Sequence, residues 1–413
     1  MSLIRPFAGL RPAPGRAAEV IAPPYDVLSS DEARARAAGK PWSFLHISKP
    51  EIDLPTGTNP YAPEVYVKAA ENLGVMTRKG VLIRDPAPCY YVYRLVMDKH
   101  TQTGLVAAAS IAEYEANRIR KHEHTQIDKE TDRVRQIDAL NAHTGPVMVG
   151  YPAAPEVDDI LARCSAGTPD ADATADSGVR HSLWVVRDAG TQERLTRAFD
   201  AMPAIYIADG HHRSAAASRV TAARRAANPR HTGEESYNTF LAVNFPHHQL
   251  QILDYNRVIA GLNGMDAAAF LARLRQSFSV QDSPRAVKPA RAGEYGLYLA
   301  GKWYRLAIRP ELVPARDPVA RHDVTLLSDH LLGPILGITD LRRDKRIDYV
   351  GGARGLAELE KRVNSGEMTA AIALYPTSME DLMAVAEAGK VMPTKSTWFE
   401  PKLADGMVSL VID

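Results

Sequence analysis

Residues 204–217 contain the densest group of side chains that could do chemistry. Five consecutive residues follow an apolar run and precede an alanine- and arginine-rich stretch typical of a helix: Asp209, Gly210, His211, His212 and Arg213. Gly210 permits a tight turn from strand to helix, and the start of a helix offers N–H groups and a positive dipole end to an anion. Arg213 would add a bidentate phosphate donor. We therefore predict an anion site; the alternative is that Asp209 only caps the helix.

A second polar segment spans residues 118–135. Five of its residues precede a charged helical stretch that holds Lys129, Asp132 and Arg133: Lys121, His122, Glu123, His124 and Thr125. A carboxylate between two histidines suits a general base or a divalent-cation ligand. On a strand, His122 and His124 would share one face, which a transition-metal site could also use. The alternative is a solvated charge run on a helix.

The proline-rich segment 21–29 presents Tyr25 and Asp26 after a proline pair. Paired prolines fix an extended backbone, so this loop either holds the two side chains toward a ligand or is a plain turn. The residues alone do not separate the two interpretations.

Residues 391–402 place two lysines around hydroxyl and aromatic side chains near the C-terminus: Lys395, Ser396, Thr397, Trp398, Phe399 and Lys402. Lysine with neighbouring hydroxyl groups suits a phosphate or a carboxylate. A solvated edge is the alternative interpretation.

Composition narrows the class of protein without revealing its chemistry. The 413 residues carry a formal net charge of +1 and are 45% hydrophobic, which is ordinary globular usage and predicts two or three domains. The near-neutral charge argues against a nucleic-acid partner, and Cys89 and Cys164 cannot form a disulfide framework. No apolar run approaches the length of a membrane helix. We expect a cytoplasmic protein with no membrane partner, and a homodimer stays open.

The periodicity of apolar residues predicts a mixed α/β fold. Helices are expected at 30–38, 61–76, 211–227, 267–278, 324–332, 355–365 and 379–388. Strands are expected at 43–48, 89–97, 105–114, 182–186, 204–208, 239–245, 250–253, 295–300, 303–308 and 370–375. A small, polar stretch at 164–178 predicts a loop. The pattern restarts near residue 255, so we expect one region at 1–254 and a C-terminal α/β domain at 255–413.

Five motifs, in this order, resemble the prokaryotic domain-of-unknown-function family numbered 1015. They are RPFAGLRP, APPYDV, KHEHT with its following charged helix, YIADGHHR and MPTKSTWFEPK. The DGHHR element is also similar to the signature of the ParB/sulfiredoxin superfamily, especially its free-serine kinases. This resemblance implies a ParB/sulfiredoxin-like core with large insertions in 1–254, in which DGHHR holds nucleotide phosphates. It also implies a separate glutamate that takes the proton of the serine hydroxyl.

The first hypothesis is phosphoryl transfer to a small hydroxylated substrate, serine or phosphoserine, with ATP or ADP as donor in the kinase direction. Gly210, His212, Arg213 and Lys121 would bind phosphate, with Glu123, His211 and Asp209 as catalytic residues. Asp209 is also the candidate ligand for Mg²⁺. Substrate-binding residues would be Tyr25, Asp26, His122, His124, Thr125, Lys395, Ser396 and Thr397.

Three alternatives use the same residues. The site could instead hydrolyse phosphoserine, as a phosphatase. The chain could be a nucleotide-binding or DNA-linked regulator related to ParB, although no helix-turn-helix module and no basic excess accompany it. The histidines at 122, 124, 211 and 212, with Glu123, could instead hold the metal of a hydrolase.

Overall fold

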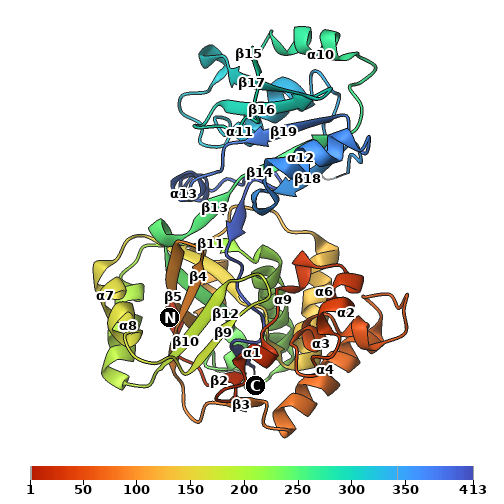
Figure 1. Cartoon of the computed structure of the whole chain (residues 1–413). Helices are drawn as coiled ribbons and strands as arrows, with labels where there is room; N and C mark the ends of the chain where they lie inside the picture. The colour runs from red at the N-terminus through yellow and green to blue at the C-terminus, as the bar shows by residue number, and fades with distance from the viewer. Residues whose placement is uncertain (1, 342, 413) are drawn as a thin grey trace. The chain divides into compact units, whose positions relative to one another are not determined.

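The computed structural model describes residues 2–341 and 343–412, which fall into two units (Figure 1). Unit 1 comprises Met1–Lys121, Thr125–Leu250 and Pro401–Asp413, and unit 2 comprises His122–His124 and Gln251–Glu400. The sequence predicts a single break after residue 254. In the structure the chain instead returns to unit 1 from Pro401 onward, and three residues of the KHEHT motif group with unit 2 although both of their chain neighbours belong to unit 1.

The architecture is mixed α/β, as the sequence predicts. In the described part of unit 1, a nine-stranded sheet has the order β6-β11-β8-β12-β5-β4-β10-β9, with β1 paired to β5. Its strands are β1 (Ile4–Arg5), β4 (Tyr90–Met97), β5 (His100–Ser110), β6 (Ile119–Arg120), β8 (Val147–Tyr151), β9 (Ala171–Thr174), β10 (Arg180–Val186), β11 (Ile205–Asp209) and β12 (Thr239–Pro246). Two pairings are parallel, β6 with β11 and β8 with β12, and the others are antiparallel.

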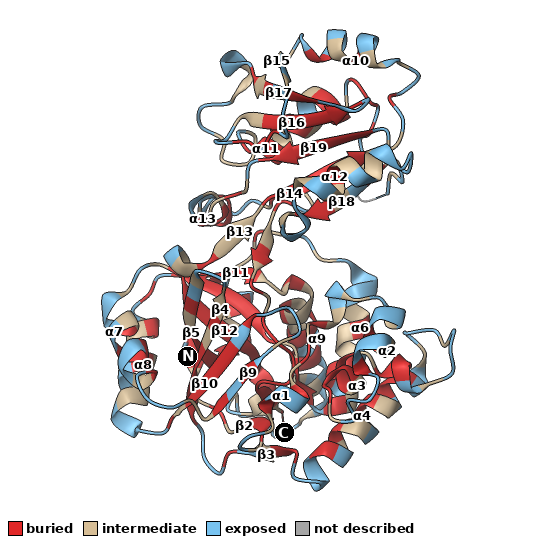
Figure 2. Ribbon diagram, in the orientation of Figure 1, coloured by how far each residue is buried: buried red, intermediate tan, exposed pale blue. Residues whose placement is uncertain are grey.

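The helices described in unit 1 either cover this sheet or pack in a second core with strands of a smaller sheet. They are α1 (Ala17–Val20), α2 (Ser30–Ala37), α3 (Leu45–Ser48), α4 (Pro63–Arg78), α5 (Ile111–Glu115), α6 (Ile127–Leu140), α7 (Pro155–Cys164), α8 (Ala189–Asp200) and α9 (His211–Ala227). Figure 1 shows α7 and α8 beside each other at one side of the sheet, with α6 and α9 at the other. Every residue of β12 is buried, and the strands of this sheet are largely buried in Figure 2. A sheet covered on both faces needs such continuous apolar strands.

A second, small sheet brings the C-terminal segment into unit 1. Its order is β3-β2-β21-β7, with β2 (Gly9–Pro12), β3 (Leu82–Arg84), β7 (Ala142–His143) and β21 (Ser409–Val411). Because β21 lies between β2 and β7, the stretch from Pro401 onward is fixed in unit 1.

Unit 2 is built on an antiparallel six-stranded sheet of order β15-β17-β16-β19-β14-β18. Its elements are β13 (Gln251–Leu253), β14 (Tyr255–Ile259), β15 (Phe278–Ser283), β16 (Glu294–Leu299), β17 (Lys302–Ile308), β18 (Ile347–Gly351), β19 (Ala370–Leu374), β20 (Trp398–Glu400), α10 (Ala267–Leu274), α11 (Asp323–Leu327), α12 (Gly355–Asn364) and α13 (Met379–Glu387). One core packs α10 and α11 with the sheet, and a smaller core packs α12 with it. Strands β13 and β20 form a separate pair.

Three local predictions were wrong. Residues 43–48, expected as a strand, contain α3, because a short apolar run without period-two alternation fits a buried helical turn equally well. The strand expected at 105–114 ends at Ser110, whose hydroxyl accepts the Glu113 N–H and caps α5. The loop expected at 164–178 contains β9, in which Ala171 and Ala173 are buried against β10.

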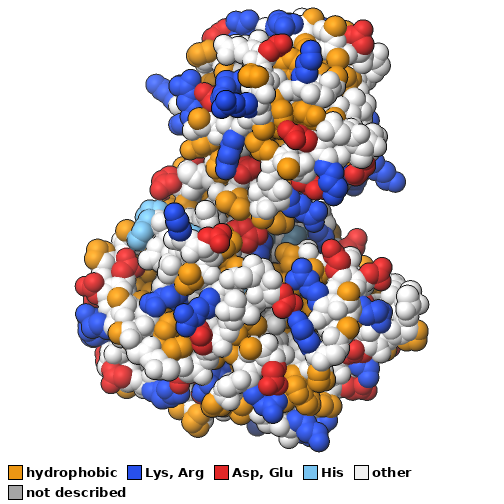
Figure 3. Space-filling model, viewed as in Figure 1, with side chains coloured by type: hydrophobic (Ala, Val, Ile, Leu, Met, Phe, Trp, Pro, Cys, Tyr) orange, Lys and Arg blue, Asp and Glu red, His pale blue; other side chains and the backbone are white. Residues whose placement is uncertain are grey.

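No helix among the described residues is both long and apolar enough to cross a membrane. On the face in view in Figure 3, lysine and arginine side chains are interspersed with aspartate and glutamate over each unit. This mixture agrees with the net charge of +1.

The turn between β11 and α9 depends on Gly210. Its φ is +101°, a left-handed conformation that L side chains rarely adopt, and Gly210 is the N-cap residue that precedes α9. A Cβ on Gly210 would lie 3.3 Å from the Cα of Val147 on the neighbouring strand β8. Both the backbone conformation and the space therefore favour glycine.

We expect Gly210→Ala to lower the free energy of unfolding by roughly 2–3 kcal/mol, since it combines left-handed strain with a tight contact against strand backbone. The control is Gly178→Ala, where φ is +84° and nothing lies within 4 Å of the added Cβ; strain alone should cost about 1–2 kcal/mol. Urea unfolding of both variants measures the difference. Equal losses would contradict the role of the Val147 contact.

Candidate active site at the start of α9

The parallel pairing of β6 with β11 brings the two polar segments together. Ile119 pairs with Ile205 and Arg120 with Tyr206, so both strands run in the same direction. The chain leaves β6 toward His122 and Glu123. Strand β11 ends at Asp209 and leads into α9 at the same edge of the sheet. Carboxyl ends of parallel strands form such shared edges.

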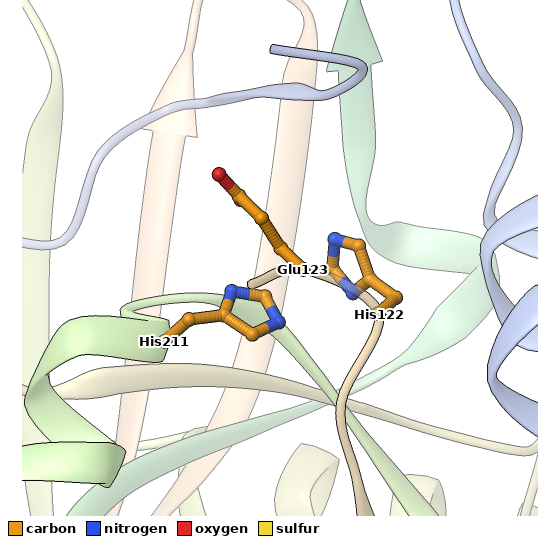
Figure 4. Close-up of side chains that lie close together, drawn as sticks. All are labelled: His122, Glu123 and His211. Carbon is orange, nitrogen blue, oxygen red and sulfur yellow. The ribbon is translucent and has the colours of Figure 1, made fainter. Parts of the chain in front are cut away.

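His122, Glu123 and His211 lie close together at this edge. One ligand atom from each of the three side chains lies within 4.8 Å of the other two, and Figure 4 shows these side chains side by side. His122 and His211 are buried, and Glu123 is partly exposed. The carbonyl oxygen of His122 accepts the N–H of Met392, from the MPTKSTWFEPK motif, at 2.7 Å. Two imidazoles and a carboxylate can hold a metal ion or transfer protons.

Asp209 forms an ion pair with Lys402 rather than capping the helix. The Lys402 Nζ donates to Asp209 Oδ2 at 2.9 Å, and both side chains are partly exposed. No side chain caps α9 at Gly210. Burial by itself would raise the pKa of Asp209, but the positive charges of Lys402 and Arg213 hold that pKa well below its ordinary value. Asp209 is therefore a carboxylate at neutral pH.

Arg213 is held in the first turn of α9 by contacts to two loops. Its guanidinium donates to the Pro146 carbonyl at 2.6 Å and lies 3.5 Å from the Asp26 carboxylate. Its Cζ is also 5.8 Å from the ring centroid of Tyr25. Burial would lower the pKa of Arg213, but the carboxylates of Asp26 and Asp209 raise it above the ordinary value. The predicted phosphate donor is thus charged and fixed in orientation.

The guanidinium of a second arginine, Arg133, packs on the ring of Tyr25. The Cζ of Arg133 lies 3.8 Å from the ring centroid, a cation–π distance, and Arg133 also donates to Asp132 at 2.9 and 2.6 Å. Burial raises the pKa of Tyr25 to about 12 although Arg133 opposes the rise. The phenol therefore stays protonated at neutral pH.

A small polar cavity of about 30 Å³ opens beside these arginines, enough for about one water molecule. Its lining includes Tyr25, Arg133, Arg213, His143 and Asp405. Asp405 is buried, and within the described residues its Oδ1 has no hydrogen-bond partner. Burial raises the pKa of Asp405 to about 7, against the opposing charge of Arg213.

His212 ties the KHEHT segment to the helix. Its Nε2 accepts the N–H of Gln126 at 3.1 Å, and the Thr125 hydroxyl donates to Glu130. Burial, assisted by the charge of Lys129, lowers the pKa of His212 to about 4. His212 is therefore a neutral ring that positions the backbone after Glu123.

The remaining predicted residues are not part of the cluster of His122, Glu123 and His211. The Lys121 ammonium lies 4.3 Å from the ring centroid of Tyr114, and His124 is exposed. Lys395, Ser396 and Thr397 belong to unit 2, where the Ser396 hydroxyl donates to the Pro393 carbonyl at 2.6 Å. The substrate roles assigned to these residues from the sequence stay predictions.

Sequence reasoning assigned no site role to Arg133 or Asp405, and it offered Lys402 to a phosphate or a carboxylate but not as the partner of Asp209. Lys402 ends MPTKSTWFEPK, Arg133 follows KHEHT on α6, and Asp405 is an acid in an apolar C-terminal stretch. A buried acid in such a stretch is itself a signal, because buried charges are normally paired. The pairing of Lys402 with Asp209 joins residues 193 positions apart, and spacing does not reveal it.

The neutral state of His212 predicts a pH dependence. Its pKa falls from an ordinary 6.5 to about 4 on folding, so its contribution is fully present above pH 6.5 and is lost as pH falls toward 4. We expect His212→Gln to remove part of the acid-side loss of stability, at most about 2 kcal/mol because the ring is partly exposed. The control is His124→Gln, on an exposed ring. Coinciding urea-unfolding profiles for the two variants between pH 4 and 7 would contradict the assignment.

Comparisons with known proteins give a family and a set of distant structural likenesses. No curated protein matches the chain. Similar solved structures include a free serine kinase in complex with AMP (12% identity, TM-score 0.38, 75% of this chain and 91% of that one). Others are a conserved hypothetical protein from Pyrococcus furiosus (13%, 0.36, 73% and 93%) and SbnI with a C-terminal truncation from Staphylococcus aureus (10%, 0.37, 73% and 85%). These values are too low to carry an argument about function.

The family resemblance inferred from the five motifs is confirmed. The model of the family described as "Protein of unknown function (DUF1015)" matches residues 4–325, most of the chain and both sides of the junction at residue 250. The chain belongs to the DUF1015 family.

Proposed function

We propose that this protein is a phosphotransferase that moves a phosphoryl group between a nucleotide and a small hydroxylated metabolite, serine or phosphoserine. The observation that carries the proposal is the approach of Glu123 to His211 within 4.8 Å, at the uncapped start of α9. A proton acceptor thus lies next to a helix start that suits an anion. The DGHHR sequence at this turn resembles the signature of the free-serine kinases of the ParB/sulfiredoxin superfamily, and this resemblance supports the same proposal.

Each group has a role in this reaction. The first N–H groups of α9 and the guanidinium of Arg213 bind the phosphates, and Lys402, oriented by Asp209, adds a positive charge at the same turn. Glu123 takes the proton of the substrate hydroxyl as its oxygen attacks the terminal phosphorus, and the nucleotide leaves with one phosphate fewer. His211 donates a hydrogen bond to the transferred group. Positioning and charge supply most of the acceleration in such reactions.

Mg²⁺ would enter bound to the nucleotide phosphates and neutralise their charge. Asp209 is the acidic residue of the DGHHR motif. Because it pairs with Lys402, it is better suited to orienting that lysine than to binding Mg²⁺ directly. The phosphatase direction uses the same residues, with water in place of the metabolite.

Phosphorus NMR of the full chain with Mg²⁺, ATP or ADP, and a panel including serine and phosphoserine tests the proposal. We expect Glu123→Gln to lower turnover at least about 100-fold, because the amide cannot accept the hydroxyl proton. The matched control is Asp128→Asn, which removes an exposed carboxylate five residues along the chain. Full activity of Glu123→Gln, or no phosphoryl transfer in either direction, would refute the assignment.

The same three side chains favour a second candidate, a metal-dependent hydrolase. Two histidines and one glutamate form a donor set that suits Zn²⁺ or another transition metal better than Mg²⁺, which prefers oxygen ligands. The sequence also offered His124 and His212 to this site. His124 is exposed, and the ring of His212 accepts a hydrogen bond from the Gln126 N–H.

Elemental analysis of the purified chain separates the two candidates. The hydrolase requires about one tightly bound transition-metal ion per chain, lost in His122→Ala and His211→Ala but retained in the control His124→Ala. The phosphotransferase requires Mg²⁺ only during turnover, so a metal content near zero in the wild-type chain would contradict the hydrolase.

A further inference from the structure

Unit 2 contains a cavity of its own that the proposed function does not use. Its volume is about 470 Å³, within the range of small-molecule sites. The walls come from the start of β16, the end of β17, the residues after β17, α11, and the segment from Tyr375 to Asp381. All of these residues lie within unit 2.

Two adjacent side chains in its wall are buried and incompletely bonded. His322 is 8% exposed and Asp323 is 6% exposed. Across the residues that the structure describes, neither ring nitrogen of His322 has a hydrogen-bond partner, and neither does Oδ2 of Asp323. The large majority of buried side-chain polar atoms in proteins are bonded, so three unbonded ones beside one cavity need an explanation.

The backbone around Asp323 fixes which of its oxygens stays available. The Gly293 N–H donates to Oδ1 at 2.8 Å, and the Tyr295 hydroxyl donates to the Asp323 carbonyl at 3.0 Å. Oδ2 remains for a donor from outside the protein. Burial lowers the pKa of His322, so the ring is neutral and offers one acceptor and one donor.

The charges of the cavity favour a cationic ligand. Besides Asp323, the carboxylate of Asp381 lines the wall. Burial, assisted by the charge of Asp381, raises the pKa of Asp323 to about 7. A cation bound beside Asp323 would favour its charged form. Glu294 is already paired with Arg291 and Arg305, at 2.9 and 3.1 Å.

The other walls are apolar, or exposed and basic. Ile308, Val313 and Leu326 give a surface for a hydrocarbon body, and Arg321 is an exposed cation. The buried polar groups of this cavity, His322 and Asp323, thus offer hydrogen-bond acceptors and an acidic side chain to a ligand.

We propose that this cavity is a binding site for a small molecule with a primary ammonium group on an apolar body. The ammonium N–H groups donate to Asp323 Oδ2 and to one ring nitrogen of His322, and the body packs on Ile308, Val313 and Leu326. The other ring nitrogen of His322 faces a polar atom of the ligand or water.

Calorimetric titration of the full chain with phenethylamine tests this site, with phenethyltrimethylammonium as the matched probe. The two probes carry the same charge and ring, but only the amine has N–H donors. We expect saturable binding of the amine and at least tenfold weaker binding of the trimethylated probe. Equal affinities would overturn the proposal, and so would an absence of saturable amine binding, because water would then satisfy these atoms.

Two variants locate the binding. Asp323→Asn keeps the Oδ1 acceptor for Gly293 and removes the charge, so we expect at least tenfold weaker amine binding. The control Asp282→Asn lies on an exposed position of β15 and should bind normally. Unchanged binding by Asp323→Asn would overturn the site.

His322→Phe keeps the ring volume and removes both nitrogens. The ring nitrogens of His322 have no hydrogen bond within the described residues to lose, and exchange of buried polar atoms for apolar ones of the same shape can be nearly neutral or stabilising. We therefore expect no fall in melting temperature together with weaker amine binding. A lower melting temperature with normal binding would show that His322 serves the fold, and would also overturn the proposal. Both readouts are independent of phosphoryl transfer.

Discussion

The parallel pairing of β6 with β11 is the constraint on which the candidate active site depends. Strand β6 has only two residues and lies at the edge of the sheet, so its direction is set by β11. β11 in turn is held by β8 through a register shift between Ile207 and Asp209. Because β6 and β11 run the same way, the KHEHT and DGHHR motifs leave the sheet together, although 86 residues separate Glu123 from Asp209. An antiparallel β6 would have sent Glu123 to the opposite edge.

Charge pairing explains how the cationic groups around α9 are held in place. Lys402 is bound to Asp209, Arg213 to Asp26, and Arg133 to the ring of Tyr25 and to Asp132. Removing a charge from water is costly unless a partner compensates it. The same pairs hold the side chains in fixed orientations, so a bound anion would meet donors that are already placed.

Unit 2 differs from unit 1 in its strand pairing, and among the residues described it has its own buried side chains with unbonded polar atoms, His322 and Asp323. Its six strands are all antiparallel, and its cores are separate from that of unit 1. The family match nevertheless runs to residue 325 and so includes His322 and Asp323. His322 and Asp323 therefore lie inside the region that the family model matches, whereas Asp381, on the same cavity, lies outside it.

The sequence by itself determined the mixed α/β class, most helices and strands, and the strand–glycine–helix turn at Gly210. These follow from local periodicity and from a backbone conformation that only glycine adopts easily. Tertiary structure alone decided that Asp209 pairs with Lys402, that Leu45–Ser48 form a helix, and that His322 and Asp323 face a cavity. Each of these depends on which distant segments pack together, and neither spacing nor composition encodes that directly.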